Sequence, residues 1–236
     1  MIIDQNKLEE KKIIELINPK NKTVLEIGCG NGNVAKFLAP LCSQYIGIDV
    51  DRKAINQAKK NTKSLPNISF LVRSGDNTKF KDRSFDTVLM HLCLHEIPPQ
   101  IQGLVLREIH RVLKDKGQLL IIDPTEPPGQ VQSLYNVGYK FLFFDHSTVV
   151  KHSIDVIQQS ISANLYEVIK KSSLKIDFSF KDLEELQNLI QNDFYEINWD
   201  LKNKKILTNE LLKITKNKTK NIILIDDLTI TNLVKI

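Results

Sequence analysis

The sequence VLEIGCGNG, residues 24–32, decides the fold. It begins as an apolar run that only Glu26 interrupts, and this run predicts a buried strand over Thr23–Ile27. Three glycines follow at alternate positions, namely Gly28, Gly30 and Gly32. Because glycine has no Cβ, the backbone there can turn tightly and approach a ligand. Asn33–Leu38 continues as the start of a helix, whose first N–H groups are unpaired, so the stretch predicts a ligand-binding turn.

Outward from this turn, short apolar runs alternate with segments of helical spacing. The expected strands are Tyr45–Asp49, Ile68–Val72, Phe85–Met90 and Gln118–Ile122. The expected helices are residues 7–17, Asp51–Asn61 with Asp51 as its cap, and Ile101–Leu113. This order predicts a doubly wound α/β fold, in which a parallel sheet is covered by helices on both faces. Ligands of such sheets bind at the carboxyl ends of the strands.

The pattern changes after Pro128. We expect helices over residues 148–171 and 181–191, strands over 194–199 and 222–228, and no assigned structure over 202–221. The resulting division predicts a nucleotide-binding core at 1–123 and a substrate lid or insertion at 124–180. Residues 181–236 would supply the strands that complete the sheet, together with a basic tail.

Composition excludes several classes of protein. The net charge is +5, and much of the excess lies in seven lysines between residues 202 and 220. They favour a solvated face over a nucleic-acid surface, since no arginine cluster or interleaved aromatics accompany them. The three cysteines form no CxxC pair, which predicts reduced core residues and neither a zinc nor a redox centre. No apolar run is long enough for a membrane span and no secretory signal is present, so we expect a cytoplasmic protein.

Three acidic residues lie in or just after the ends of successive strands, and they restrict the class of ligand. Dinucleotide-binding turns have the spacing GxGxxG, whereas the third glycine of this turn comes one residue earlier. The negative charge of Glu26 would also repel a pyrophosphate. A ligand with a positive ammonium and sulfonium suits this turn better. Asp49 ends the second strand, where doubly wound folds bind the ribose hydroxyls of an adenosine. Asp76 follows the third strand, and there two interpretations stay open: a contact to the adenine amine, or a turn aspartate.

Four ordered segments resemble the class I S-adenosylmethionine (SAM)-dependent methyltransferases, and most of all the small-molecule branch that includes the ubiquinone and menaquinone methyltransferases. They are VLEIGCGNGNVAKFL (24–38), YIGIDVDRKAINQAK (45–59), GDNTKFKDRSFDTVLMHLCLHEI (75–97) and VLREIHRVLKDKGQLLIID (105–123). The resemblance implies a mostly parallel seven-stranded, Rossmann-like sheet with a helical lid, and SAM as the cofactor. Lys116-Gly117 stands where the family often has Gly-Gly, and the chain after Pro124 has no clear counterpart.

The resemblance also implies roles by position. The methionine end of SAM would lie against Glu26, Gly28, Cys29, Gly30, Gly32 and His91. The ribose would be held by Asp49, and the adenine would lie against Val50, Asp76 and Asn77.

Methyl transfer is an in-line displacement that mainly requires alignment and desolvation of the reactants. A base is needed only when the acceptor carries a proton of high pKa. His95 is the candidate base, because an unperturbed histidine has a pKa near neutrality; the alternative is a structural histidine at a helix start. His91, His95 and Glu96 lack the HExxH order and an evident third ligand, so we expect no metal.

The absence of two motifs restricts the class of methyl acceptor. No Asn/Asp-Pro-Pro-Tyr/Phe run follows the fourth strand, and no Pro-Cys pair occurs, which favours a small-molecule acceptor over a nucleobase. Tyr135, Tyr139 and Phe143 would contact that acceptor or simply form core. Transfer to RNA or protein, and a catalytically silent SAM-binding protein, are the alternatives; the loop spacing argues against a dehydrogenase. The sequence specifies neither the acceptor atom nor the oligomeric state.

Overall fold

The computed structural model describes residues 2–4, 7–126, 128–142 and 146–236. The chain forms two compact units. The core unit comprises residues 10–123, 151–172 and 229–236, and the second unit comprises residues 1–9, 124–150 and 173–228. Two long strands, β7 (Tyr166–Asp182) and β8 (Lys220–Lys235), contribute residues to both units.

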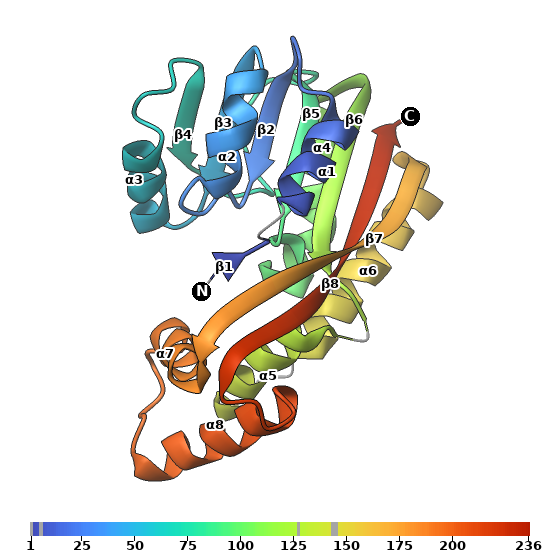
Figure 1. Ribbon diagram of the computed structural model, residues 1–236. Coiled ribbons are helices and arrows are strands. Elements are labelled where there is room, and N and C mark those ends of the chain that lie inside the picture. Colours follow the sequence, from blue (N-terminus) through green and yellow to red (C-terminus); the bar gives the residue numbers. More distant parts are fainter. Residues whose placement is uncertain (1, 5–6, 127, 143–145) are drawn as a thin grey trace. The chain divides into compact units, whose positions relative to one another are not determined.

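The core unit is built on seven strands of an eight-stranded sheet. Five strands are parallel neighbours in the order β6-β5-β2-β3-β4. Their bounds are β2 (Thr23–Ile27), β3 (Gln44–Asp49), β4 (Ile68–Val72), β5 (Phe85–His91) and β6 (Leu113–Pro124). Portions of β8 and β7 continue the sheet beyond β6, and the arrow of β8 points opposite to those of β2, β3 and β4 (Figure 1). The predicted mostly parallel seven-stranded fold is confirmed.

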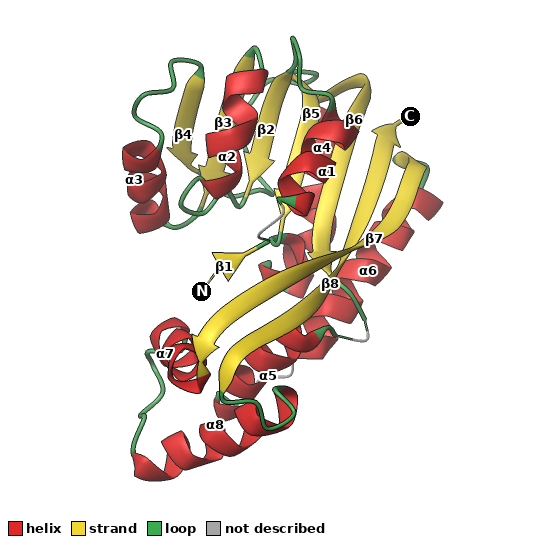
Figure 2. Cartoon of the chain, in the orientation of Figure 1, coloured by secondary structure: helices red, strands yellow, loops and turns green. Residues whose placement is uncertain are grey.

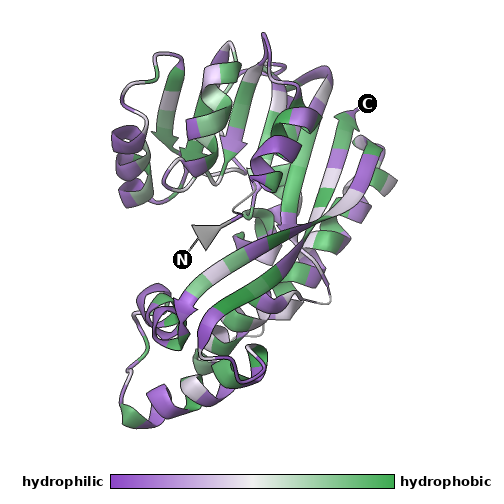
Figure 3. Ribbon diagram, viewed as in Figure 1, coloured by the Kyte–Doolittle hydropathy of each residue, from purple (hydrophilic) through white to green (hydrophobic). Residues whose placement is uncertain are grey.

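Helices cover both faces of this sheet (Figure 2). They are α1 (Leu8–Ile17), α2 (Asn33–Leu38), α3 (Arg52–Asn61), α4 (Pro99–Val112) and α6 (His146–Ser162), with short 3-10 turns η1 (Ala39–Leu41) and η2 (Leu94–Glu96). The side chains of Leu106 and Ile109 on α4 and Val156 on α6 share one buried cluster with β5 and β6. Figure 3 shows the hydrophobic character of these inner strands, as expected for a sheet buried on both faces.

The second unit has its own apolar core. Its helices are α5 (Gln130–Phe141), α7 (Leu183–Asp193) and α8 (Leu201–Ile214). Their buried side chains meet those of β7 and β8, and include Leu134, Leu186, Ile190, Leu207 and Leu211. The short strand β1 (Ile2–Ile3) pairs antiparallel with β7, so that Ile2 faces Ser179.

Two predicted elements are wrong. The helix expected over 148–171 ends at Ser162, since Asn164 adopts a left-handed φ of 56° that stops it, and β7 begins at Tyr166. The strand expected over 194–199 is a turn, in which the Trp199 Nε1–H donates to the Phe194 carbonyl over 3.1 Å. The unassigned stretch 202–221 contains α8. The segment 124–180 contributes to both units, and its role as a lid stays a prediction.

Candidate cofactor site

The glycine turn after β2 is held against the end of β3. The Gly28 and Cys29 amides both donate to the Ile48 carbonyl, over 2.9 and 3.0 Å. Gly28, Gly30 and Gly32 have backbone φ values of 71°, 50° and 79°. Residues other than glycine rarely adopt such positive φ values. A Cβ on Gly28 would lie 2.1 Å from the Cys93 sulfur, whereas a Cβ on Gly30 would meet no atom within 4 Å. Gly28 is therefore required for packing, and the space beside Gly30 is open to a ligand.

The two aspartates after β3 have different roles. The Gly30 amide donates to Asp49 Oδ2 and the Asp51 amide to Asp49 Oδ1, each over 2.9 Å. Each oxygen of Asp49 keeps a lone pair for another donor. The Asp51 side chain accepts from the Lys53 amide over 2.7 Å and caps α3, as predicted. Asp49 is thus the aspartate that is free to face a ligand.

A pocket of about 380 Å³ opens beside Gly30 and Asp49, entirely within the core unit. Its remaining lining consists of Ile27, Gly28, Val50, Arg73, Ser74, Gly75, Leu92, Cys93, Glu96, Ile97, Pro98, Ile101 and Val105. The side formed by the glycine turn is polar, and the side formed by Ile97, Ile101 and Val105 is apolar. A concave site with one polar and one apolar wall suits a small organic ligand.

Glu26 lies on β2, just before the glycine turn, and is not among the residues that line the pocket. Its side chain is buried and accepts a hydrogen bond from the Tyr45 hydroxyl, which is buried as well. Burial raises the pKa of Glu26 to about 7, although the Tyr45 hydrogen bond and the nearby His91 act in the opposite direction. Glu26 can therefore exchange a proton near neutrality, and a cationic ligand close by would favour its charged form.

The other residues expected to contact the cofactor differ in whether they line the pocket. Val50 is 70% exposed and lines it. The half-buried Asp76 accepts from the Ser74 hydroxyl, and Ser74 and Gly75 line the pocket in its place. Asn77 is exposed, and its backbone N–H donates to the Ser74 carbonyl over 3.3 Å.

Three further positions lie behind the lining. Cys29 is buried, and Gly32 precedes α2 close to Ala58. His91 ends β5 and is half-buried, while the next residue, Leu92, points into the pocket region.

The loop after β5 is fixed by buried polar side chains that the sequence did not single out as a group. Asp123, at the end of β6, accepts from the Cys93 and His95 amides, both over 3.1 Å. Gln102 on α4 is fully buried, and its Nε2 donates to the Leu94 and Ile97 carbonyls over 3.0 and 2.9 Å. These hydrogen bonds join the loop, which includes Ile97, to helix α4, which carries Ile101 and Val105, so that loop and helix together form the apolar wall.

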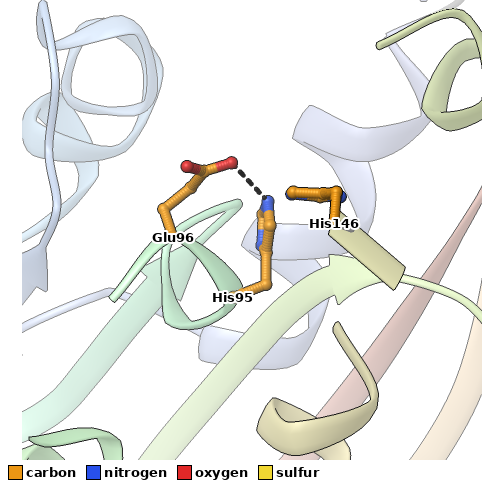
Figure 4. A group of neighbouring side chains, drawn as sticks. All are labelled: His95, Glu96 and His146. Atoms are coloured by element: carbon orange, nitrogen blue, oxygen red, sulfur yellow. Dashed lines mark ion pairs between the residues drawn. The ribbon is translucent and has the colours of Figure 1, made fainter. Parts of the chain in front are cut away.

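His95 is buried between two carboxylates. Its Nδ1 lies 2.9 Å from Asp123 Oδ1. Its Nε2 lies 3.1 Å from Glu96 Oε1, as Figure 4 shows. Burial alone would lower the pKa of His95, but hydrogen bonds to Asp123 and Glu96 raise it to about 9. This pKa lies above the ordinary value on which the predicted role as a base rested, and that role stays a prediction. A ring protonated at neutral pH would also position the loop, because it contacts both carboxylates.

Of the aromatic residues expected near an acceptor, Tyr135 and Tyr139 pack in the second unit. Tyr139 contacts the Phe194 ring edge-on with 5.0 Å between centroids, and the Tyr135 hydroxyl donates to Asp193 over 2.6 Å. Both are part of that unit's core packing. Phe143 lies outside the described residues.

Comparisons with known proteins agree with this geometry. Residues 24–117 match the family described as "Methyltransferase domain". A demethylmenaquinone methyltransferase of Staphylococcus saprophyticus is 25% identical over 191 residues, which are 79% of this chain and 76% of that protein.

Two solved structures share the fold over 96% of the chain. The YcgJ protein of Bacillus subtilis has a TM-score of 0.66 at 20% identity, with 97% of it covered. The [4+2]-cyclase SpnF has a TM-score of 0.61 at 14% identity, with 80% of it covered.

The fold is of the doubly wound α/β class, and its pocket adjoins the carboxyl ends of the strands, where such sheets bind ligands. The domain match and the relatives support a class I, SAM-dependent methyltransferase. None of its described helices is both long and apolar enough to cross a bilayer.

Proposed function

We propose that this methyltransferase acts on a small organic acceptor. The observation that carries the proposal is the pocket in which the glycine turn and Asp49 face an apolar wall formed by the β5 loop and α4. An apolar wall with few polar groups suits a ring or chain of a small molecule and excludes water from the reacting atoms.

We further propose how the residues divide the cofactor between them. Gly28 and Gly30 allow the methionine part to approach the backbone, while the buried Glu26 offsets its positive charge. The free lone pairs of Asp49 accept from the ribose hydroxyls, and Val50 and the Ser74–Asn77 turn border the adenine. When bound, SAM supplies an activated methyl group, and the residues of this chain align the acceptor with it.

The demethylmenaquinone methyltransferase relative favours a quinone-type ring as the acceptor. Such a ring would lie against Ile97, Ile101 and Val105, which form the apolar side of the pocket. Its reaction requires loss of one proton. Glu96 lines the same pocket next to Ile97, and it would be placed to accept this proton, since Asp49 is assigned to the ribose.

The test is a transfer assay with methyl-labelled SAM against a panel of demethylated quinones, phenols, small amines, RNA and bulk protein. Label in one class of small molecule, lost in an Ile101→Asp variant that still binds SAM, would support the proposal. Label that enters only RNA or protein would overturn it. SAM binding without label in any acceptor would identify a silent binding protein.

A further inference from the structure

Helix α8 presents an outer surface that combines lysines with exposed aliphatic side chains. Leu207 and Leu211 are completely buried in the core of the second unit, which turns the opposite side of the helix outward. Leu201 is 89% exposed and Ile206 is 42% exposed on that outer side. We call this the α8 surface; it consists of Tyr195, Leu201, Lys202, Lys204, Lys205, Ile206 and Lys213. Figure 3 shows hydrophobic and hydrophilic residues interspersed along the helix.

The turn before α8 holds the apolar part of this surface in place. Phe194 and Ile197 are buried on either side of Tyr195, which is itself 78% exposed. Trp199 packs edge-on against Phe141 with 5.2 Å between ring centroids. The Asp200 side chain accepts from the Asn203 amide over 2.8 Å and so caps the helix beside Leu201. Tyr195 and Leu201 are therefore held at the surface by a well-packed turn. A binding partner that covered these two side chains would remove their apolar area from water.

The charge of the α8 surface is strongly positive. Helix α8 contains four lysines and one glutamate, and Lys216, Lys218 and Lys220 follow it. Lys213 pairs with Glu210 over 2.5 Å. Within the described part of the chain, Lys202, Lys204 and Lys205 make no ion pair with an acidic side chain. These three lysines consequently present uncompensated charge beside the exposed Leu201 and Ile206.

We propose that the α8 surface docks the protein on an anionic lipid bilayer. Lysines attract such a bilayer through its surface potential, and exposed Leu, Ile and Tyr side chains insert at the level of the headgroups. A nucleic-acid surface would gain nothing from Leu201 and Ile206, and no arginine occurs after Arg111 to read a base or clamp a phosphate. The proposal is independent of which acceptor receives the methyl group.

The test is co-sedimentation of the full-length protein with vesicles. We expect it to sediment with vesicles of phosphatidylcholine and one third phosphatidylglycerol, and to stay in solution with phosphatidylcholine alone. The triple variant Lys202→Gln, Lys204→Gln, Lys205→Gln should reduce the partition coefficient by about tenfold or more. The double variant Leu201→Ser, Ile206→Ser should also reduce it by about tenfold, and this loss should persist at low salt.

A matched control separates local from overall charge. Lys53, Lys59 and Lys60 are exposed on α3 of the core unit, and changing all three to Gln removes the same charge elsewhere. This control should sediment like wild type. Equal losses in both triple variants would overturn the proposal, as would the absence of sedimentation by folded wild type. Wild type that ignores the vesicles but binds an RNA or DNA oligonucleotide would assign the surface to nucleic acid instead.

Discussion

The backbone amide of Gly30 donates to Oδ2 of Asp49 over 2.9 Å, and this hydrogen bond joins the glycine turn after β2 to the end of β3. Both residues line the pocket: a Cβ on Gly30 would meet no atom within 4 Å, and each oxygen of Asp49 keeps a lone pair for a further donor. If this is the cofactor site, as we propose, its backbone is organised before a ligand arrives, which reduces the entropy that binding would otherwise lose.

Gly28 should matter mainly for the stability of the fold, and Gly30 mainly for the binding of SAM. Gly28→Ala places a methyl group against the Cys93 sulfur and should lower the free energy of unfolding by about 2–4 kcal/mol. Gly30→Ala meets no atom, so it should cost only about 1 kcal/mol of backbone strain while weakening SAM binding. Urea unfolding and SAM titration of both variants check this. A larger loss of stability in Gly30→Ala would contradict the assignment.

Glu26 should make the protein less stable as the pH rises. Its pKa is about 7 in the fold and 4.5 ordinarily, so the folded state keeps a proton that the unfolded state loses in this range. The free energy of unfolding should therefore fall between pH 4.5 and 7, by roughly 3 kcal/mol at most. Glu26→Gln retains an acceptor for the Tyr45 hydroxyl and should remove this contribution. An unchanged pH slope in the variant would show that Glu26 is not the titrating group.

His95 should titrate well above neutrality. Its pKa of about 9 exceeds the ordinary 6.5, so its stabilising contribution is complete below pH 6.5 and disappears as the pH rises through 9. Asp123→Asn removes one of the two carboxylates and should lower the pKa of His95, which NMR titration of the imidazole would measure. A wild-type midpoint near 6.5 would contradict the structure and favour His95 as a candidate base.

Glu108 should stabilise the loop that follows β4. It accepts from the amide and hydroxyl of Thr78, over 2.9 and 2.6 Å, and pairs with Arg111 over 2.7 Å. These contacts, led by the hydrogen bond from Arg111, lower the pKa of Glu108 to about 2. Its stabilisation is present above pH 4.5 and is lost as the pH falls through 2. Glu108→Gln should cost about 1–2 kcal/mol at neutral pH in a denaturation experiment, and a neutral effect would show that the ion pair is dispensable.

Local patterns in the sequence predicted the elements that are decided locally. The run VLEIG and the cap at Asp51 appear in the structure as predicted, because burial and capping depend on near neighbours along the chain. The end of the long helix was missed, since Asn164 in a left-handed conformation leaves only a weak signal in a polar stretch. The contact between His95 and Asp123 joins residues 28 positions apart, and spacing alone could not predict the resulting pKa.

The apolar wall of the pocket was missed for a related reason. Ile101 and Val105 belong to the helix predicted over Ile101–Leu113, and the apolar spacing of a helix is the same whether its apolar face meets a core or a ligand. Gln102 lies between them and gives no sign in the sequence that it holds the β5 loop. Their role depends on where α4 packs, which only the tertiary structure shows.

The central claim is tested most directly by calorimetric titration of SAM into wild type, Asp49→Ala and the control Asp155→Ala, which changes an exposed aspartate of α6. We expect wild type and the control to bind alike, and Asp49→Ala to bind more weakly by about 1–3 kcal/mol. Equal affinity in all three proteins, or no binding by folded wild type, would contradict the assignment of the glycine turn and Asp49 as the SAM site.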